Sequence, residues 1–150
     1  MGQLSLFGKP RLLLVSGEDN GPFIDLMKLC GAEMICAPTA KEGLSRLRSE
    51  EFDAVLIYVY LGTGASRDDE EFQEMPFERY FAGLRLLELV KNIGFKRKNS
   101  EKSIPVVVMN TVPKRDINHF VNNRLGEKDL HFFPPDDSMK IVSHLRNLAS

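Results

Sequence analysis

Three continuous apolar runs constrain the fold of this chain more than any other feature of its sequence. They read RLLLV at 11–15, DAVLIYVY at 53–60 and IPVVVM at 104–109. A strand with one wet face alternates polar and apolar residues, whereas an unbroken run is typical of a strand buried on both faces. Strands of this kind belong to parallel sheets that helices cover on both sides. The runs therefore predict an α/β fold.

Two shorter strands and a set of helices are expected around these runs. Glu33–Ala37 predicts a strand between the first two runs, and Leu130–Phe133 predicts one after the third. Elsewhere apolar residues recur at the spacing of one buried helix face, so strand and helix alternate along the chain. The expected helix faces carry Phe23, Met27 and Cys30; Leu44 and Leu47; Leu84, Leu87 and Val90; Ile117, Phe120, Val121 and Leu125; and Ile141, Leu145 and Leu148.

Capping residues mark the ends of the first two helices. Thr39 and Glu42 form a capping box, in which a hydroxyl and a carboxylate each satisfy a free backbone amide. Asp19 or Asn20 is expected to cap the first helix, because short polar side chains accept hydrogen bonds from first-turn amides. Gly31 is expected to end that helix.

Strict alternation of buried strands and helices predicts one domain over residues 1–150. The expected architecture is three-layered and flavodoxin-like, a (βα)5 fold around a doubly wound five-stranded parallel sheet. Residues 61–77 break the rhythm with glycines and the acidic run Asp68–Glu71, and this segment is predicted to be an inserted, exposed loop. In such sheets ligands bind beyond the carboxyl ends of the strands. The candidate functional residues are therefore those that directly follow the strands.

Charge and hydropathy argue against several classes of function. The net charge of -1 favours neither nucleic acid nor anionic lipid, and the basic stretch Lys96–Lys102 is short and without interleaved aromatic residues. The apolar runs are too short to span a bilayer and no signal segment opens the chain, so a cytoplasmic protein is expected. Cys30 and Cys36 have apolar neighbours, and both are interpreted as core thiols.

The residues that follow the strands give the chain a resemblance to the receiver domain of bacterial response regulators, which are CheY-like. The spacing from Val15 to Tyr58, Asn110 and Pro135 is similar to the spacing of four receiver strand ends. Gly83-Leu84 is similar to the start of the family's third helix. The resemblance covers almost the whole chain and implies the same fold.

The resemblance places different residues at the family's phosphorylation site. A receiver's first strand ends in acidic residues that hold Mg²⁺, where this chain has Ser16 and Gly17. The third strand ends in the aspartate that accepts the phosphoryl group, where this chain has Tyr58. Asn110 stands at the threonine or serine that follows the fourth strand, and Pro134 stands at the lysine that follows the fifth. The resemblance therefore implies a degenerate phosphorylation site.

These substitutions remove separate requirements of phosphoryl transfer. Mg²⁺ needs oxygen ligands, the nucleophile must be a carboxylate, and the developing charge needs donors. We therefore expect no enzyme activity, no metal and no cofactor. Glu18 and Asp19 remain an alternative pair of metal ligands if the first loop bulges. Tyr58 ends a buried strand, so its ring is expected to pack and its hydroxyl to be hydrogen-bonded.

Two classes of function remain open. The first is a phosphorylation-independent pseudo-receiver in a two-component or phosphorelay system, which binds a protein partner or a second copy of itself because the sequence holds no output domain. The family's pairing surface, made by its fourth helix, fifth strand and fifth helix, places candidate contacts at Asn118, Asn122, His131 and His144. The alternative is a small-ligand-binding or enzymatic flavodoxin-like domain that uses the crevice at the strand ends, although the sequence has no glycine-rich phosphate loop that leads into a helix.

Overall fold

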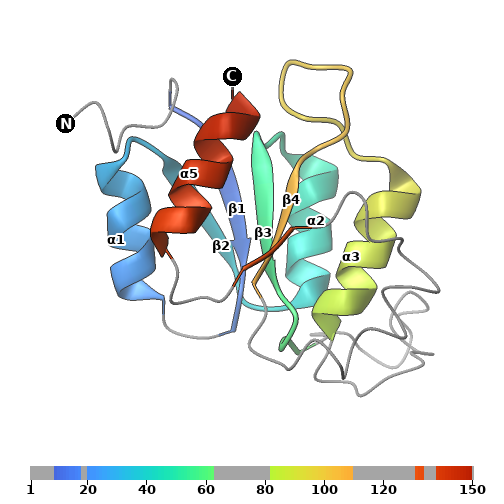
Figure 1. Ribbon diagram of the computed structural model, residues 1–150. Helices are drawn as coiled ribbons and strands as arrows, with labels where there is room; N and C mark the ends of the chain where they lie inside the picture. Colours follow the sequence, from blue (N-terminus) through green and yellow to red (C-terminus); the bar gives the residue numbers. More distant parts are fainter. Residues whose placement is uncertain (1–8, 18–19, 63–81, 110–130, 134–137, 150) are drawn as a thin grey trace.

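A computed structural model shows a parallel sheet with helices on both faces (Figure 1). The structure describes residues 9–17, 20–62, 82–109, 131–133 and 138–149. Its helices and strands are β1 (Arg11–Val15), α1 (Gly21–Leu29), β2 (Glu33–Ala37), α2 (Ala40–Ser49), β3 (Ala54–Tyr58), α3 (Ala82–Ile93), β4 (Val106–Met109), β5 (His131–Phe133) and α5 (Ser138–Ala149).

The sheet has the order β2-β1-β3-β4-β5, and every neighbouring pair of strands is parallel. Strand β1 lies inside the sheet, where Leu13 pairs with Ile35 of β2 on one side and with Val55 of β3 on the other. The chain thus builds outward from β1 in both directions, which is the arrangement of a doubly wound fold. The predicted five-stranded parallel sheet is confirmed.

The core has two layers because successive side chains of each strand face opposite sides of the sheet. Leu13 and Val15 of β1 are buried in the layer under α2 and α3, and Leu12 and Leu14 are buried in the layer under α1 and α5. Figure 1 shows these two helix pairs on opposite sides of the sheet. Burial on both faces is the physical reason that the sequence of this strand is an unbroken apolar run.

The predicted end of α1 and the Thr39 half of the predicted capping box are confirmed. Thr39 is the N-cap of α2, and its Oγ1 accepts a hydrogen bond from the backbone amide of Glu42 at 3.2 Å. Gly31 follows α1 with a φ of 100°, in the left-handed region that favours glycine after a helix. Cys30, directly before it, is a buried thiol as predicted.

The interpretation of Cys36 as a core thiol is wrong, because its side chain is exposed. It lies on β2, which is an edge strand of the sheet. Edge strands are covered less completely than inner ones, and of the five residues of β2 only Ala37 is buried. An apolar run as short as this one does not distinguish an edge strand from an inner strand.

Several predictions fall outside the described residues. They are the helix expected after Thr111, most of the inserted loop with its acidic run Asp68–Glu71, and the residues Glu18, Asp19, Asn110, Pro134 and Pro135. Within the part of the chain that the structure describes, no helix is long and apolar enough to cross a membrane.

Candidate functional site

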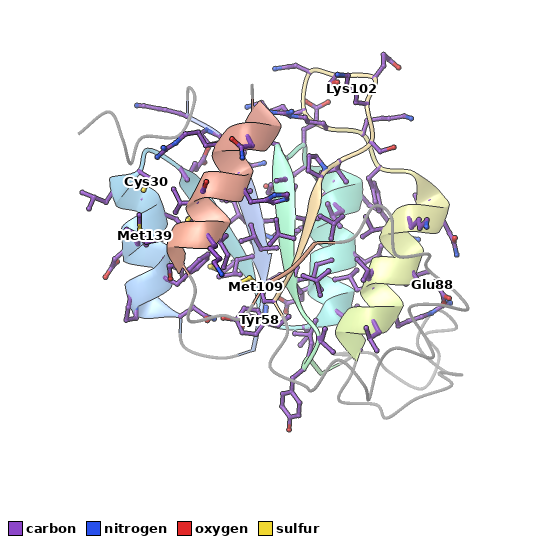
Figure 2. All side chains as sticks on the ribbon, in the orientation of Figure 1. Cys30, Tyr58, Glu88, Lys102, Met109 and Met139 are labelled. Atoms are coloured by element: carbon purple, nitrogen blue, oxygen red, sulfur yellow. The ribbon has the colours of Figure 1, made fainter. Side chains whose placement is uncertain are left out.

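The candidate site lies at the carboxyl ends of β1, β3 and β4, where the fold places ligand sites in other doubly wound sheets. Tyr58 is the last residue of β3 and pairs with Met109, the last residue of β4. Figure 2 shows these two side chains together at the same end of the sheet. The amide of Val59 donates to the Met109 carbonyl at 3.1 Å, so the pairing continues one residue past β3. The two strand ends therefore hold each other in place.

Ser16 is the first residue after β1 and is fixed through its backbone. Its amide donates to the Ala37 carbonyl at 2.9 Å, and the residue is only 8% exposed. Gly17 follows and is exposed, and a Cβ at this position would lie 3.2 Å from the Pro38 carbonyl oxygen. The chain therefore turns away from the sheet here with little room for a side chain at Gly17.

Tyr58 occupies the place where the resemblance puts a phosphoacceptor, and it is 2% exposed. Its ring belongs to the core layer between the sheet and the helices α1 and α5. Its hydroxyl donates a hydrogen bond of 2.5 Å to Oδ1 of Asn20. The prediction of a packed ring with a hydrogen-bonded hydroxyl is confirmed.

Asn20 links the two strand ends, and this role was not predicted. Its Nδ2 donates to Oγ of Ser16 at 2.8 Å, while its Oδ1 accepts from the Tyr58 hydroxyl. Asn20 does stand at the N-cap position of α1, but its side chain makes no capping hydrogen bond. The predicted cap position is therefore confirmed at Asn20 without the hydrogen bond expected from its side chain, and the alternative, Asp19, lies outside the described residues. The amide is turned toward the sheet, where it satisfies two buried hydroxyl groups that would otherwise cost free energy.

The start of α3 packs directly against the backbone of Tyr58. A Cβ added at Gly83 would lie 1.9 Å from the Tyr58 carbonyl oxygen, so no larger residue fits without movement. The amide of Ala82 donates to the Leu61 carbonyl at 3.0 Å, and the amide of Ala40 donates to the Gly62 carbonyl at the same distance. The segment after β3 is thus tied to the first residues of both α2 and α3.

The chemistry open to the described residues at these strand ends follows from the groups that they carry. At Ser16, Gly17, Asn20 and Tyr58 the site offers hydroxyl and amide groups and no carboxylate, whereas Mg²⁺ in proteins is held by carboxylates. The Tyr58 hydroxyl donates to an amide oxygen, which is too weak a base to activate it as a nucleophile. Among the described residues no three His, Cys, Asp or Glu side chains are grouped as a metal site would require. The side chains that are present instead close the site by hydrogen bonding to one another.

Charged side chains gather at the opposite, amino-terminal edge of the sheet. Arg11 of β1 binds Glu50 at 2.5 Å, and Arg46 of α2 binds the other carboxylate oxygen of Glu50 at 2.8 Å. These hydrogen bonds, with Arg46 contributing most, lower the pKa of the Glu50 carboxyl. The Arg11 guanidinium also lies 4.8 Å from the centre of the Phe52 ring. This cluster joins β1, α2 and the start of β3, and its role is structural.

The residues predicted for a partner surface are described only in part. His131 opens β5 and pairs with Val107, although its side chain is not described. His144 lies half-buried on α5, one residue before the buried Leu145. Asn118 and Asn122 lie outside the described residues. The structure therefore places β5 at the edge of the sheet and α5 on the face that it shares with α1 (Figure 1), without testing the predicted surface.

Comparison with known proteins gives matches only among solved structures. No family model and no curated protein matches the sequence. A CheY-like response regulator receiver domain protein from Methanospirillum hungatei JF-1 has a TM-score of 0.57 and 20% identity, over 94% of this chain and 97% of that chain. The chemotaxis response regulator CheY4 of Vibrio cholerae has a TM-score of 0.59 and 13% identity, over 91% and 98% of the two chains. A two-component response regulator from Clostridium difficile has a TM-score of 0.62 and 13% identity, over 93% and 95%.

These structures are similar to this chain along nearly their whole length, so the chain has the receiver fold. At identities of 20% or less the likeness shows the fold and carries no information about which residues act. What the site does must therefore be argued from its own geometry.

Proposed function

We propose that this chain is a pseudo-receiver, a signalling module that acts by binding a protein partner and not by phosphoryl transfer. The proposal includes a place in a two-component or phosphorelay system and a cytoplasmic location. The receiver fold supports the signalling role. The absence of an acceptor carboxylate at the end of β3 supports independence from phosphorylation.

One observation carries the proposal, which is the hydrogen-bonded chain from Tyr58 through Asn20 to Ser16. A phosphoryl group or a metal ion at this edge would need to displace a buried phenol and break both hydrogen bonds. The side chains that stand in place of the acidic residues supply no carboxylate. They also occupy the space of the site and are hydrogen-bonded to one another through Asn20. Such a site favours one fixed conformation over a switch between two.

The partner surface belongs to the same proposal. Strand β5 is an edge strand of the described sheet, and Ile141, Val142 and Leu145 of α5 are buried in the core layer that also holds residues of α1, β1, β3 and β4. We place the contact at this edge, with Asn118, Asn122, His131 and His144 as the candidate contacts. We expect the wild-type protein to self-associate in light scattering or to capture a protein partner from its host. Asn118→Lys together with His144→Glu should abolish that association. An unchanged result in both measurements would move the contact elsewhere.

The test of phosphorylation independence is a titration of the ¹⁵N-labelled protein with beryllofluoride and Mg²⁺, followed by amide chemical shifts. We expect no saturable shift at Ser16, Gly17 or Tyr58, because beryllofluoride binds as a phosphoryl analogue only where a carboxylate and a metal ion hold it. Tyr58→Asp is the matched variant, and it should also fail to bind, since Ser16 and Gly17 still supply no metal ligands. Saturable shifts in the wild-type protein would refute the proposal.

A further inference from the structure

A basic hairpin between α3 and β4 forms a second surface, at the edge of the sheet away from Tyr58. It spans residues 94–103, and Figure 1 shows it projecting beyond the ends of the helices. Lys102 on the hairpin and Tyr58 are labelled at opposite ends of the molecule in Figure 2. This surface is therefore independent of the degenerate site and of the function proposed for it.

Backbone hydrogen bonds give the hairpin a defined shape. Lys96 and Ser103 form an antiparallel bridge, and the amide of Arg97 donates to the Lys102 carbonyl at 2.8 Å. Asn99 turns the chain at the tip with a φ of 56°, a left-handed conformation that asparagine tolerates better than most residues. The amide of Lys102 donates to Oγ of Ser100 at 3.0 Å. The positions of the basic residues are thus set by the backbone.

The hairpin is also anchored to the body of the protein at its base. The amide of Lys98 donates to the Phe52 carbonyl at 2.9 Å, and the amide of Ile104 donates to the Phe95 carbonyl at the same distance. Ile104 is buried in the core, and Phe95 packs against the same core layer. A ligand on the hairpin would therefore bind a surface that is already ordered, which lowers the entropy cost of association.

The charge of the hairpin departs from that of the rest of the chain. It carries four cations and one carboxylate, a net charge of +3, so the remaining residues carry -4 within a total of -1. Lys96, Lys98 and Lys102 make no ion pair within the described residues, whereas Arg11, Arg46 and Arg85 do. Of the three carboxylates nearest in sequence to Phe52, Glu50 binds two arginines and Asp53 accepts from the Arg11 amide at 2.7 Å, whereas Glu51 is exposed.

We propose that this hairpin binds an acidic segment of a partner protein. Clustered cations on a fixed loop attract an anionic chain and orient it as it approaches. A peptide suits the surface better than a nucleic acid, because the one aromatic residue of the hairpin, Phe95, packs against the core and is not presented for base stacking. Ile93, directly before the hairpin, is 45% exposed and offers an apolar contact that a peptide side chain can cover.

The test uses the full-length protein and a short fluorescent peptide in which Asp and Glu alternate with Ser around a single Leu. Fluorescence anisotropy at low ionic strength should show saturable binding that weakens as salt is added. The same peptide with Asn and Gln in place of the acids should not bind. A single-stranded DNA of equal charge is the third probe.

Two triple variants separate a specific surface from total charge. Lys96→Gln, Lys98→Gln and Lys102→Gln together should weaken peptide binding about tenfold, as expected for the loss of three charge pairs at the surface. Lys28→Gln, Lys41→Gln and Lys140→Gln remove the same charge from exposed positions elsewhere and should weaken it less than about twofold. Both variants should unfold at the wild-type temperature, because the hydrogen bonds of the hairpin come from its backbone and one serine. If the hairpin variant proves unstable, Lys102→Gln alone provides the comparison.

Three results would overturn the proposal. They are no saturable binding of the acidic peptide, equal losses in the two triple variants, or tighter binding of the DNA than of the peptide. None of these results bears on phosphorylation independence, which rests on the opposite edge of the sheet.

Discussion

The hydrogen-bonded chain at the strand ends makes a quantitative prediction about Tyr58. Tyr58→Phe keeps the buried ring and removes only the hydroxyl that donates to Asn20. Losing one partner of a buried hydrogen bond costs about 1–3 kcal/mol, and Asn20 is only half-buried, so we expect the free energy of unfolding to fall by about 1.5 kcal/mol. For a chain of this size that corresponds to a fall in Tm of about 3–6 °C.

A double-mutant cycle with Asn20→Ala tests whether the two side chains act together. Asn20→Ala alone removes the acceptor of the Tyr58 hydroxyl and the donor to Ser16, so it should cost about 2–3 kcal/mol. The double variant should cost less than the sum of the two by about 1 kcal/mol, because the shared hydrogen bond is lost only once. The assay is urea unfolding followed by circular dichroism, with m-values compared to confirm that the unfolding transition is the same.

Tyr60→Phe is the matched control, because Tyr60 follows Tyr58 by two positions and is 49% exposed. We expect its free energy of unfolding to stay within about 0.5 kcal/mol of the wild-type value. Two results would show that the hydrogen bonds from Tyr58 through Asn20 to Ser16 do not stabilise the protein. They are additive effects of Tyr58→Phe and Asn20→Ala on the free energy of unfolding, or equal effects of the two tyrosine substitutions.

Three further predictions concern the rest of the structure. Gly83→Ala should destabilise the protein by about 1–3 kcal/mol, despite the better helix propensity of alanine, because the new methyl group meets the Tyr58 carbonyl. Glu50→Gln should be less stable than the wild type at neutral pH, and the difference should shrink as the pH falls below about 4.3. In thiol titration of the native protein Cys36 should react and Cys30 should not, because the Cys36 side chain is exposed and the Cys30 side chain is buried.

Each of these predictions has a control and a contradicting outcome. Gly62→Ala is the control for Gly83→Ala, since Gly62 lies outside the helices and a Cβ there would meet nothing, and equal losses of stability at the two glycines would refute the packing argument. The direction of the pH dependence at Glu50 follows from its lowered pKa. A carboxyl whose pKa is lower in the folded state stabilises that state at pH values above its unfolded pKa. This stabilisation is lost when the pH falls and the carboxyl is protonated. A pH-independent difference would contradict it. Both thiols should react in guanidinium. Equal reaction rates of Cys30 and Cys36 in the native protein would contradict the burial of Cys30 and the exposure of Cys36.

The sequence predicts the inner strands well because burial on both faces determines which residue types these strands contain. Residues 12–15 and 54–58 pack on both faces, so apolar residues are required at every position and the run is unbroken. Strand β2 has the same kind of sequence and a different environment, since whether a strand lies at an edge depends on the whole sheet. The error at Cys36 follows from that difference.

The candidate site is predictable in its positions and less so in its contacts. Counting from the strand ends places Ser16 and Tyr58 at the same edge, because carboxyl ends of parallel strands lie together. The link through Asn20 was missed, because an asparagine before a helix usually caps it. Its actual partner on β3 is 38 residues away, and a hydrogen bond over that separation depends on the folded geometry. A buried tyrosine hydroxyl that needs a partner is the one signal that could have pointed to it.

A phosphoryl-transfer assay is the most direct test of phosphorylation independence. The protein is incubated with acetyl phosphate and Mg²⁺, and its intact mass is measured under conditions that preserve acyl phosphates, beside a receiver that has the acceptor aspartate. We predict that the mass of the wild-type protein stays unchanged while the control gains a phosphoryl group. An acid-labile phosphoryl adduct on this chain would contradict phosphorylation independence.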